Sequence, residues 1–393
     1  MIIGPKVKGF ICTTAHPKGC EKNIADYLAY LDSKPKIDLP GIKNALVIGA
    51  SAGYGLASAM AASFSLGASV TAVALEKNAK ANRTATAGLY NLAAYKKQAD
   101  ARGLRVTPVV ADAFAHQTRE KVRELLGPEN EQVDLLVYSV AAPARIDPDT
   151  GERYSSVLKP VGREYKSKGI DLNSYKMNEI SIAPASPQEI ANTVKVMGGE
   201  DLKLWAGYLR QYDLLSENAI ILAYSYIGPE LTHDIYLNGT IGAAKAHLKQ
   251  TADELGAYIS VNKALVTQAS GAIPVLPLYI SLLFKVMKDK GLHEGCTEQI
   301  YRLFRKLEAG TGLRDPEGYI RIDDCEMRDD VQREVAASWE SVSDDNLSEL
   351  ADLAGYRSDF LKLFGFGLEG VDYSADVEPA VDEVALGFVN LSE

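Results

Sequence analysis

The sequence predicts an α/β fold in which helices cover both faces of a parallel sheet. Strand-like apolar runs alternate with helical stretches through the first two-thirds of the 393 residues, which is the pattern of repeated strand–helix–strand units. The runs are almost continuously apolar, as expected of strands that are buried on both faces of a sheet. They span residues 44–50, 68–76, 104–112, 133–142, 218–228 and 257–267.

The composition indicates an ordinary globular protein, with 47% hydrophobic and 24% charged residues. A net charge of −10 argues against a nucleic-acid-binding face, because phosphate neutralisation needs clustered Lys and Arg. The most apolar stretch, residues 272–287, is interrupted by Pro274 and Pro277 and is shorter than the ~20 residues that span a bilayer. We therefore expect no membrane span, and a buried or cleft-lining helix at this place.

The cysteines and the first residues favour a cytoplasmic protein. Four cysteines spread over the chain are too few and too scattered for a disulfide framework, so a reducing compartment is the simpler expectation. The opening residues lack the uninterrupted apolar run of a signal peptide.

A glycine-rich turn follows the first strong strand. The sequence VIGASAGYGLASAMAASF, residues 47–64, runs from this strand through the turn into an alanine-rich helix. Gly49, Gly53 and Gly55 allow a sharp bend and let backbone N–H groups approach a pyrophosphate at the helix N-terminus. This placement predicts that the turn binds a dinucleotide pyrophosphate. The alternative is a tight strand-to-helix turn without a ligand.

The ends of the next strands offer further cofactor contacts. Glu76 ends the second strand, twenty-seven residues after Gly49, where a carboxylate can bind an adenosine ribose and repel a 2′-phosphate. This favours NADH, whereas the nearby cations Lys77, Lys80 and Arg83 leave NADPH as the alternative.

Two other strand ends have predicted contacts. Asp112 and Ala113 end the third strand, where an adenine ring would lie, and Val140 and Ala141 follow the fourth, on the nicotinamide side. Ordinary strand ends without a ligand are the alternative interpretation of both pairs.

Two parts of the chain exceed a minimal nucleotide-binding fold. Residues 143–217 form an insertion between two strands, in which Ser186 is the N-cap of a helix and Pro187 its first residue. Residues 271–393 are expected to be helical substrate-binding and C-terminal elements. Because no Gly/Ser-rich or Pro-rich linker occurs, we expect one integrated domain, 1–393, with a nucleotide-binding core of residues 41–142 and 218–270.

The segment YLNGTIGAAK places Tyr236 nine positions before Lys245. Gly239 and Thr240 mark a helix start, so Tyr236 precedes the helix and Lys245 lies in its second turn. A lysine near a tyrosine hydroxyl and a ribose can hold the ribose and favour the phenolate, which makes the tyrosine a usable proton donor. Tyr226, at a strand end, brings a second phenol to the same cleft. With twenty tyrosines in the chain, the alternative is a packing role for both phenols.

Other candidate chemistry is weak. The histidine–cysteine pairs in HPKGC (16–20) and HEGC (293–296) lack a CxxC pair or a second histidine at ligand spacing, so we expect no metal site. A serine nucleophile is not supported, because no G-x-S-x-G elbow occurs.

Taken together, these motifs resemble the FabV-type enoyl-acyl-carrier-protein reductases and the related trans-2-enoyl-CoA reductases. Within this resemblance the Tyr236-x8-Lys245 spacing is specific, since ordinary short-chain dehydrogenases have a Tyr-x3-Lys pair. The other matching features are Glu76 and the segments GASAGYGLAS (49–58), DAF (112–114), YSVAAP (138–143), VLKP (157–160), VMGGED (196–201), AYSYIGPE (223–230), ALVTQAS (264–270), FKVMK (284–288), HEGC (293–296) and FGFGLEGVDY (364–373).

The resemblance implies an enlarged Rossmann-type doubly wound parallel sheet, like that of short-chain dehydrogenases. It also implies an NADH-dependent enzyme, usually monomeric although a dimer is the alternative, that reduces the C2=C3 bond of an enoyl thioester carried by CoA or acyl-carrier protein. It implies that Tyr236 is the proton donor, that Tyr226 contacts the acyl substrate and that Lys245 binds the cofactor. The other cofactor residues that it implies are Gly49, Ala50, Ser51, Ala52, Gly53 and Tyr54 at the pyrophosphate, Leu75 and Glu76 at the adenosine ribose, Asp112 and Ala113 at the adenine, and Val140, Ala141, Leu265, Val266 and Thr267 at the nicotinamide half.

Two other functions stay open from the residues alone. A carbonyl-reducing short-chain dehydrogenase would share the glycine loop and the tyrosine–lysine pair. A non-catalytic NADH-binding sensor would keep the loop, while the pair would be structural.

Overall fold

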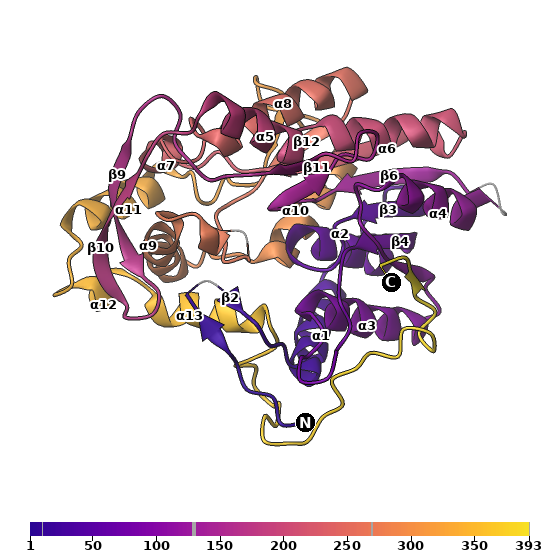
Figure 1. The fold of residues 1–393 in the computed structure, drawn as a ribbon, viewed down its shortest axis with the longest axis horizontal. Helices are drawn as coiled ribbons and strands as arrows, with labels where there is room; N and C mark the ends of the chain where they lie inside the picture. The colour runs from indigo at the N-terminus through magenta and orange to yellow at the C-terminus, as the bar shows by residue number, and fades with distance from the viewer. Residues whose placement is uncertain (10, 128–130, 269, 393) are drawn as a thin grey trace.

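The computed structural model describes residues 1–9, 11–127, 131–268 and 270–392, and a parallel sheet lies at its centre (Figure 1). Within these residues the sheet has the strand order β13-β12-β11-β6-β3-β4-β5-β14, and every neighbouring pair is parallel. The strands are β3 (Asn44–Ile48), β4 (Ser69–Ala74), β5 (Val106–Val110), β6 (Val133–Tyr138), β11 (Leu215–Ser225), β12 (Tyr258–Val261), β13 (Tyr319–Arg321) and β14 (Val389–Asn390). The predicted doubly wound parallel sheet is confirmed.

Alternate side chains of the strands enter two different cores. Ala45 and Val47 of β3 pack with apolar side chains of the helices on one face. Leu46 and Ile48 pack with those on the other face. A strand buried on both faces has no polar side, which is why the sequence shows continuous apolar runs instead of alternation.

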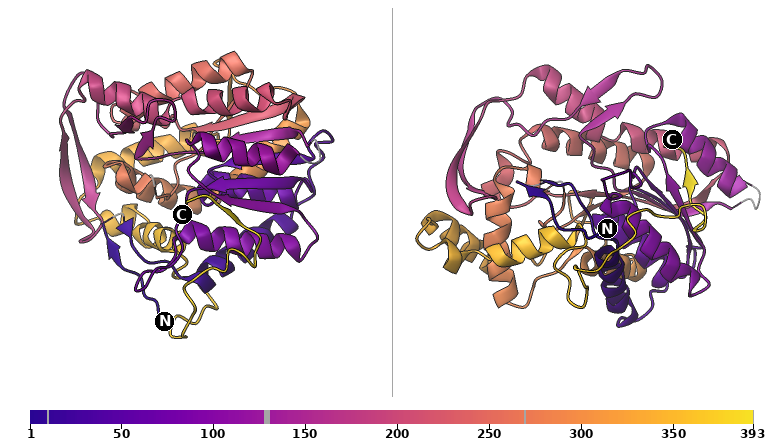
Figure 2. Two further views of the ribbon diagram at one scale, coloured as in Figure 1. Left: turned by 45° about the vertical axis from the view of Figure 1, so that its right-hand side comes forward. Right: turned by 60° about the horizontal axis from the view of Figure 1, so that its bottom comes forward.

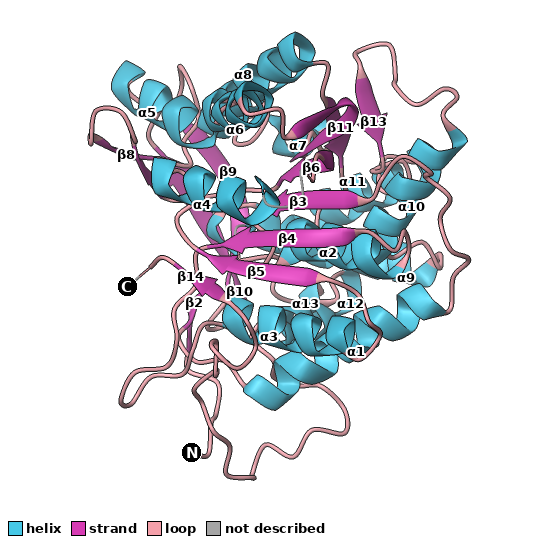
Figure 3. Ribbon diagram, turned by 90° about the vertical axis from the view of Figure 1, so that its right-hand side faces the viewer, coloured by secondary structure: helices cyan, strands magenta, loops and turns pink. Residues whose placement is uncertain are grey.

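The helices form layers on the two faces of the sheet (Figure 3). One layer comprises α1 (Pro17–Asp32), α2 (Gly53–Phe64), α3 (Ala87–Asp100) and α10 (Cys296–Ala309). The other comprises α4 (His116–Leu126), α6 (Glu200–Gln211) and α8 (Thr240–Leu255). The predicted helix start at Gly239 and Thr240 is confirmed, because Gly239 is the N-cap of α8.

The insertion contains two hairpins in addition to its helix. These are β7 (Ala144–Ile146) with β8 (Arg153–Ser155), and β9 (Tyr165–Asp171) with β10 (Lys176–Ile182). The helix α5 (Pro187–Met197) has the predicted Ser186 N-cap within a complete capping box. The β9–β10 hairpin was not predicted, because its strands carry charged residues on half-exposed positions.

A third apolar core lies at the other end of the molecule, where β9, β10 and the C-terminal helices gather at the left of Figure 1. Its helices are α9 (Leu276–Asp289), α11 (Asp329–Ser341), α12 (Leu347–Leu350) and α13 (Leu353–Lys362), preceded by a short 3-10 turn at Ser270–Ala272. The expected buried helix is confirmed as α9, in which eleven residues are buried.

The two ends of the chain run along the same side of the molecule (Figure 2). The N-terminal strands β1 (Val7–Lys8) and β2 (Ile11–Cys12) form a small hairpin, and the amino group of Met1 donates to the carbonyl of Val377. Beyond it, the amide of Asn78 donates to the carbonyl of Val381 at 2.8 Å, and β14 then pairs with β5. The C-terminal segment therefore fastens the loop after β4 to the rest of the fold.

None of the helices in the described ranges is long and apolar enough to cross a membrane. All four cysteines, Cys12, Cys20, Cys296 and Cys325, are free thiols.

Candidate active site

The glycine loop joins β3 to α2 at the point where the strand order reverses. A Cβ at Gly49 would lie 2.2 Å from the carbonyl oxygen of Ser139, and one at Gly55 would lie 1.9 Å from the carbonyl oxygen of Gly49. Only glycine fits at either position. At Gly53, by contrast, the backbone has φ +55° and a Cβ would meet nothing within 4 Å.

The start of α2 is open to an anion. Its N-cap, Ala52, offers no side chain to the first-turn N–H groups, and these groups carry the positive end of the helix dipole. Together with the open side at Gly53, this arrangement fits a dinucleotide pyrophosphate.

Glu76 lies two residues beyond β4 and turns inward toward the loop. A Cβ at Gly88 would lie 2.0 Å from its Oε1. Burial raises the pKa of the Glu76 carboxyl, while hydrogen bonds from the Ser51 and Thr86 side chains lower it in part. The Glu76 carboxyl is therefore fixed by hydrogen bonds beside the glycine loop and is not a freely solvated charge. Its neighbour Leu75 is 57% exposed.

Asn91 of α3 supports the same corner. Its Nδ2 donates to the carbonyl of Ser51 at 3.0 Å, while its buried Oδ1 finds no hydrogen-bond partner among the residues that the structure describes. A buried polar atom without a partner is costly unless a ligand satisfies it. Asn91 therefore fits a cofactor contact that the sequence did not suggest.

The remaining predicted cofactor residues follow the carboxyl ends of neighbouring strands, which is where such sheets bind ligands. Asp112 and Ala113 follow β5, and Val140 and Ala141 follow β6. The carbonyl of Ala113 accepts a hydrogen bond from the indole of Trp205 at 3.0 Å, which fixes the turn after β5.

Leu265, Val266 and Thr267 follow β12 and precede the 3-10 turn that leads into α9. Leu265 and Val266 are buried, and Thr267 exchanges hydrogen bonds of 2.9 and 3.0 Å with Ser270. This segment is thereby held at the end of the sheet next to β11.

Two tyrosines meet beside this segment. Tyr226 directly follows β11, and Tyr236 lies in the turn between α7 (Glu230–His233) and α8. Their rings pack edge to face, with centroids 5.0 Å apart. The hydroxyl of Tyr226 donates to Glu326 at 3.1 Å. The hydroxyl of Tyr236 has no hydrogen-bond partner among the described residues, so its proton is free for a ligand.

Lys245 lies in the second turn of α8 and connects this pair to the cofactor loop. Its Nζ donates to the carbonyl of Tyr224 at 2.8 Å, and the ring of Tyr224 packs against that of Tyr54, with centroids 5.5 Å apart. Burial lowers the pKa of Lys245 to about 8. The break between Tyr236 and Lys245 thus places the two residues on separate elements, Tyr236 in the turn before α8 and Lys245 in its second turn.

One expectation about the pair needs correction. Lys245 was expected to favour the phenolate of Tyr236, but burial raises the pKa of Tyr236, and the amine of Lys245 is bonded to a backbone carbonyl. Desolvation disfavours the charged phenolate. The phenol therefore keeps its proton near neutral pH, as a proton donor must.

Comparison with known proteins places the chain in a family. A family model described as the trans-2-enoyl-CoA reductase catalytic region matches residues 83–307. The chain is 50% identical over 387 residues to the trans-2-enoyl-CoA reductase [NADH] of Clostridium perfringens, covering 96% of this chain and 99% of the relative. The chain belongs to the trans-2-enoyl-CoA reductase family.

Other members of the family agree with this assignment. The enoyl-[acyl-carrier-protein] reductase [NADH] of Coxiella burnetii is 49% identical over 391 residues, which covers 96% of both chains. The crystal structure of Treponema denticola trans-2-enoyl-CoA reductase in complex with NAD superimposes with a TM-score of 0.92 at 46% identity, covering 97% of this chain and 99% of that one.

Two further family models match the flanks. The NAD(P)H binding domain of trans-2-enoyl-CoA reductase matches residues 2–81, and the enoyl reductase FAD binding domain matches residues 314–377. The words FAD binding are part of the name of the second model and assign no flavin to this chain. Residues 314–377 form β13, α11, α12 and α13, and Glu326 lies between β13 and α11.

Several residues of the site were missed from the sequence. Glu326 is buried and accepts hydrogen bonds from Tyr226 and from the buried Tyr279, and Lys263 is buried directly before Ala264. Glu326 lies in the acidic run IDDCEMRDD, in which no local pattern distinguishes it. Lys263 and Tyr279 did carry a signal. A lysine in an apolar strand and a tyrosine in the apolar stretch LPLYISLLF both need buried partners.

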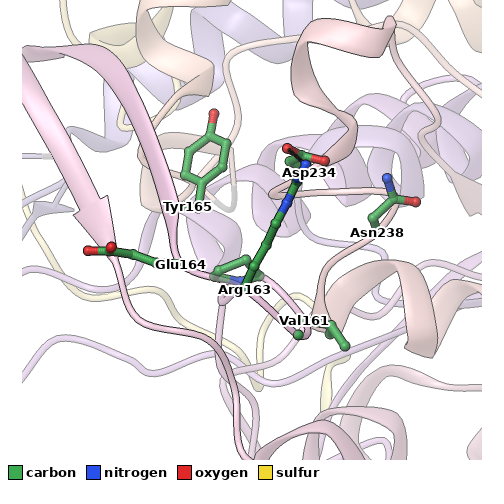
Figure 4. Close-up of a pocket in the computed structure, with 8 residues that line it drawn as sticks. Val161, Arg163, Glu164, Tyr165, Asp234 and Asn238 are labelled. Carbon is green, nitrogen blue, oxygen red and sulfur yellow. Dashed lines mark hydrogen bonds and ion pairs between the residues drawn. The ribbon is translucent and has the colours of Figure 1, made fainter.

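A separate hollow of about 430 Å³ lies on the outer side of the turn that carries Tyr236. Asp234 and Asn238 line it from this turn, and Arg163 crosses it to pair with Asp234 at 2.6 Å (Figure 4). None of the predicted cofactor residues lines this hollow. Across the described ranges, no three His, Cys, Asp or Glu side chains gather as metal ligands would.

Proposed function

We propose that this reductase uses NADH to reduce the C2=C3 double bond of trans-2-enoyl thioesters, giving saturated acyl thioesters in fatty-acid metabolism. The observation that carries the proposal is the Tyr226–Tyr236 pair, with ring centroids 5.0 Å apart, in a fold whose glycine loop is shaped for a dinucleotide. When bound, NADH supplies a hydride. The family relatives named as NADH-dependent reductases support this coenzyme.

The cofactor would be held by the loops after the strands. Gly49 to Tyr54 would hold the pyrophosphate, Leu75 and Glu76 the adenosine ribose, and Asp112 and Ala113 the adenine. On the nicotinamide side we assign Val140, Ala141, Leu265, Val266, Thr267 and Lys245. The inward carboxylate of Glu76 supports NADH over NADPH, because a fixed negative charge repels a 2′-phosphate.

The substrate chemistry assigns distinct tasks to the side chains. Conjugation to the thioester carbonyl makes C3 electrophilic, and reduction there leaves negative charge on the carbonyl oxygen. The free hydroxyl of Tyr236 would donate to this oxygen, since donors that face growing charge stabilise a transition state most. The enolate then takes up a proton at C2, supplied by the Tyr236 hydroxyl and replaced from solvent, which completes the saturated product. Lys245 would hold the cofactor side of the same cleft, and Tyr226 would contact the acyl group.

The deciding experiment follows NADH and NADPH oxidation with crotonyl-CoA, with a longer enoyl-CoA and with an enoyl-acyl-carrier protein. Oxidation of NADH with the enoyl thioesters is expected. Oxidation with ketones but not with enoyl thioesters would indicate a carbonyl reductase. NADH binding without turnover would indicate a sensor. The CoA and carrier-protein arms identify the carrier, because the relatives are named for both.

The proposal also covers the organisation of the enzyme. We propose a monomer formed as one domain, 1–393, in the cytoplasm. Free thiols at all four cysteines support a reducing compartment. The pairing of β13 and β14 with the core sheet supports one domain. Sedimentation of the purified chain at several concentrations tests the monomer.

A further inference from the structure

A buried carboxylate lies behind the two tyrosines. Glu326, in the segment between β13 and α11, is 0% exposed. Its Oε1 accepts hydrogen bonds from the hydroxyls of Tyr226 at 3.1 Å and Tyr279 at 2.7 Å. Its Oε2 accepts one from the backbone N–H of Ala264 at 2.7 Å. One carboxylate therefore joins the end of β11, the helix α9 and the segment after β12.

The contacts of Glu326 converge on the predicted site. Tyr226 is the proposed acyl contact, and Ala264 directly precedes Leu265, Val266 and Thr267, the proposed nicotinamide-side residues. Tyr279 is fully buried on α9 and also accepts a hydrogen bond from Gln332 at 3.3 Å.

The charge of Glu326 is expensive to bury. Lys263 is 2% exposed, and its Nζ donates to the carbonyl of Ala264 at 3.0 Å and lies 5.0 Å from the ring centroid of Phe284. Burial raises the pKa of Glu326, while its hydrogen bond from Tyr279 and the charge of Lys263 lower it. Among the described residues Glu326 forms no salt bridge, and a buried carboxylate without an ion pair is a poor choice for stability alone.

The bond from Tyr226 to Glu326 limits what Tyr226 can do. A phenol has one O–H and donates to one acceptor at a time. With its proton directed at Glu326, Tyr226 is fixed in orientation, whereas the hydroxyl of Tyr236 stays free. The two phenols are therefore not equivalent.

We propose that Glu326 is a positioning residue for enoyl-thioester reduction, which fixes the hydroxyl of Tyr226 and acts on the substrate only through it. This role rests on the proposed function. Glu326→Gln keeps the size of the side chain, but its NH2 group cannot accept a hydrogen bond. With the NH2 toward the tyrosines the bond from Tyr226 is lost, and with the NH2 toward Ala264 the backbone N–H loses its acceptor. The catalytic efficiency kcat/KM for crotonyl-CoA should fall by about tenfold or more, the usual effect of losing a hydrogen bond to a charged group. NADH affinity is followed in parallel by fluorescence titration, because the Ala264 bond to Glu326 also holds the proposed nicotinamide-side segment, and kcat/KM is therefore measured at saturating NADH.

The test is a double-mutant cycle with Tyr226→Phe. If Glu326 acts through Tyr226, Glu326→Gln lowers kcat/KM in the parent but causes almost no further loss in the Tyr226→Phe background. An equal loss in both backgrounds, or no loss in the parent, would overturn the positioning role. If Glu326→Gln does not fold, Glu326→Asp keeps the charge but withdraws it by one methylene, and the same cycle applies.

A matched control separates positioning from stability. Asp201 is another buried carboxylate that accepts from a tyrosine, Tyr138, at 3.1 Å, but none of its partners belongs to the proposed substrate site. Asp201→Asn should lower the unfolding temperature and leave kcat/KM per folded enzyme unchanged. Absence of enoyl turnover in the parent chain would refute the proposed function together with the positioning role, whereas an equal loss in both backgrounds refutes the positioning role alone.

Discussion

Replacing Tyr236 by phenylalanine tests the proposed proton donor directly. The ring is 8% exposed and packs edge to face on Tyr226, and phenylalanine retains that packing. The hydroxyl makes no hydrogen bond to any described residue, so its removal leaves no protein group unpaired. We therefore expect an unfolding temperature within about 2 °C of the parent and unchanged NADH affinity.

The catalytic effect of Tyr236→Phe should be large. Loss of one donor to a developing oxyanion typically costs about 3 kcal/mol, which corresponds to a decrease in kcat of about 10²-fold or more. Steady-state NADH oxidation with crotonyl-CoA measures kcat and KM, and fluorescence titration measures NADH binding. A large loss of kcat with unchanged NADH affinity distinguishes a donor from a packing residue.

Tyr165 provides a matched control for this prediction. It is 7% exposed, belongs to the same apolar core as Tyr236 and lines the outer hollow, so Tyr165→Phe also removes a single hydroxyl nearby. Its kcat should stay within about twofold of the parent. Turnover like that of the parent in Tyr236→Phe, or equal losses in the two variants, would refute the donor assignment.

Three further predictions follow from the cofactor side. Glu76→Gln removes the charge that repels a 2′-phosphate, so the KM for NADPH should fall by about tenfold relative to that for NADH; an unchanged ratio in steady-state assays would show that Glu76 does not discriminate. Because burial lowers the pKa of Lys245 to about 8, its amine is a cation below that pH and neutral above it. The kcat/KM for NADH should therefore decrease as the pH rises through about 8, and Lys245→Arg, which stays charged, should lack this decrease; the same pH profile in both proteins would rule Lys245 out as its source. Gly55→Ala would place a methyl group 1.9 Å from the carbonyl oxygen of Gly49, whereas a Cβ at Gly41 meets nothing within 4 Å. The unfolding temperature should fall by about 3–8 °C in Gly55→Ala and stay constant in Gly41→Ala, and equal thermal shifts in the two variants would contradict the tight loop.

The central sheet could be predicted because its strands and its glycine loop each leave a pattern within a short stretch of sequence. Continuous apolar runs such as residues 44–50 and 133–142 are required of strands buried on both faces, and the glycine loop requires glycine wherever a Cβ would collide, as at Gly49 and Gly55. The short strands β13 and β14 escaped prediction. They are three and two residues long, which is too short for a sequence pattern. They become strands because they pair with the edge strands β12 and β5 of the core sheet.

The candidate site likewise combines features set by the local sequence with features set by tertiary contacts. The sequence by itself determined the glycine loop, the strand ends with Glu76 and Asp112, and the helix break that separates Tyr236 from Lys245. Each depends on neighbours in the chain and on local conformation. Only the tertiary structure decided the protonation of Tyr236, since burial sets its pKa, and the orientation of Tyr226. The partner of Tyr226 is Glu326, one hundred residues away, and only the folded chain brings that carboxylate to the end of β11.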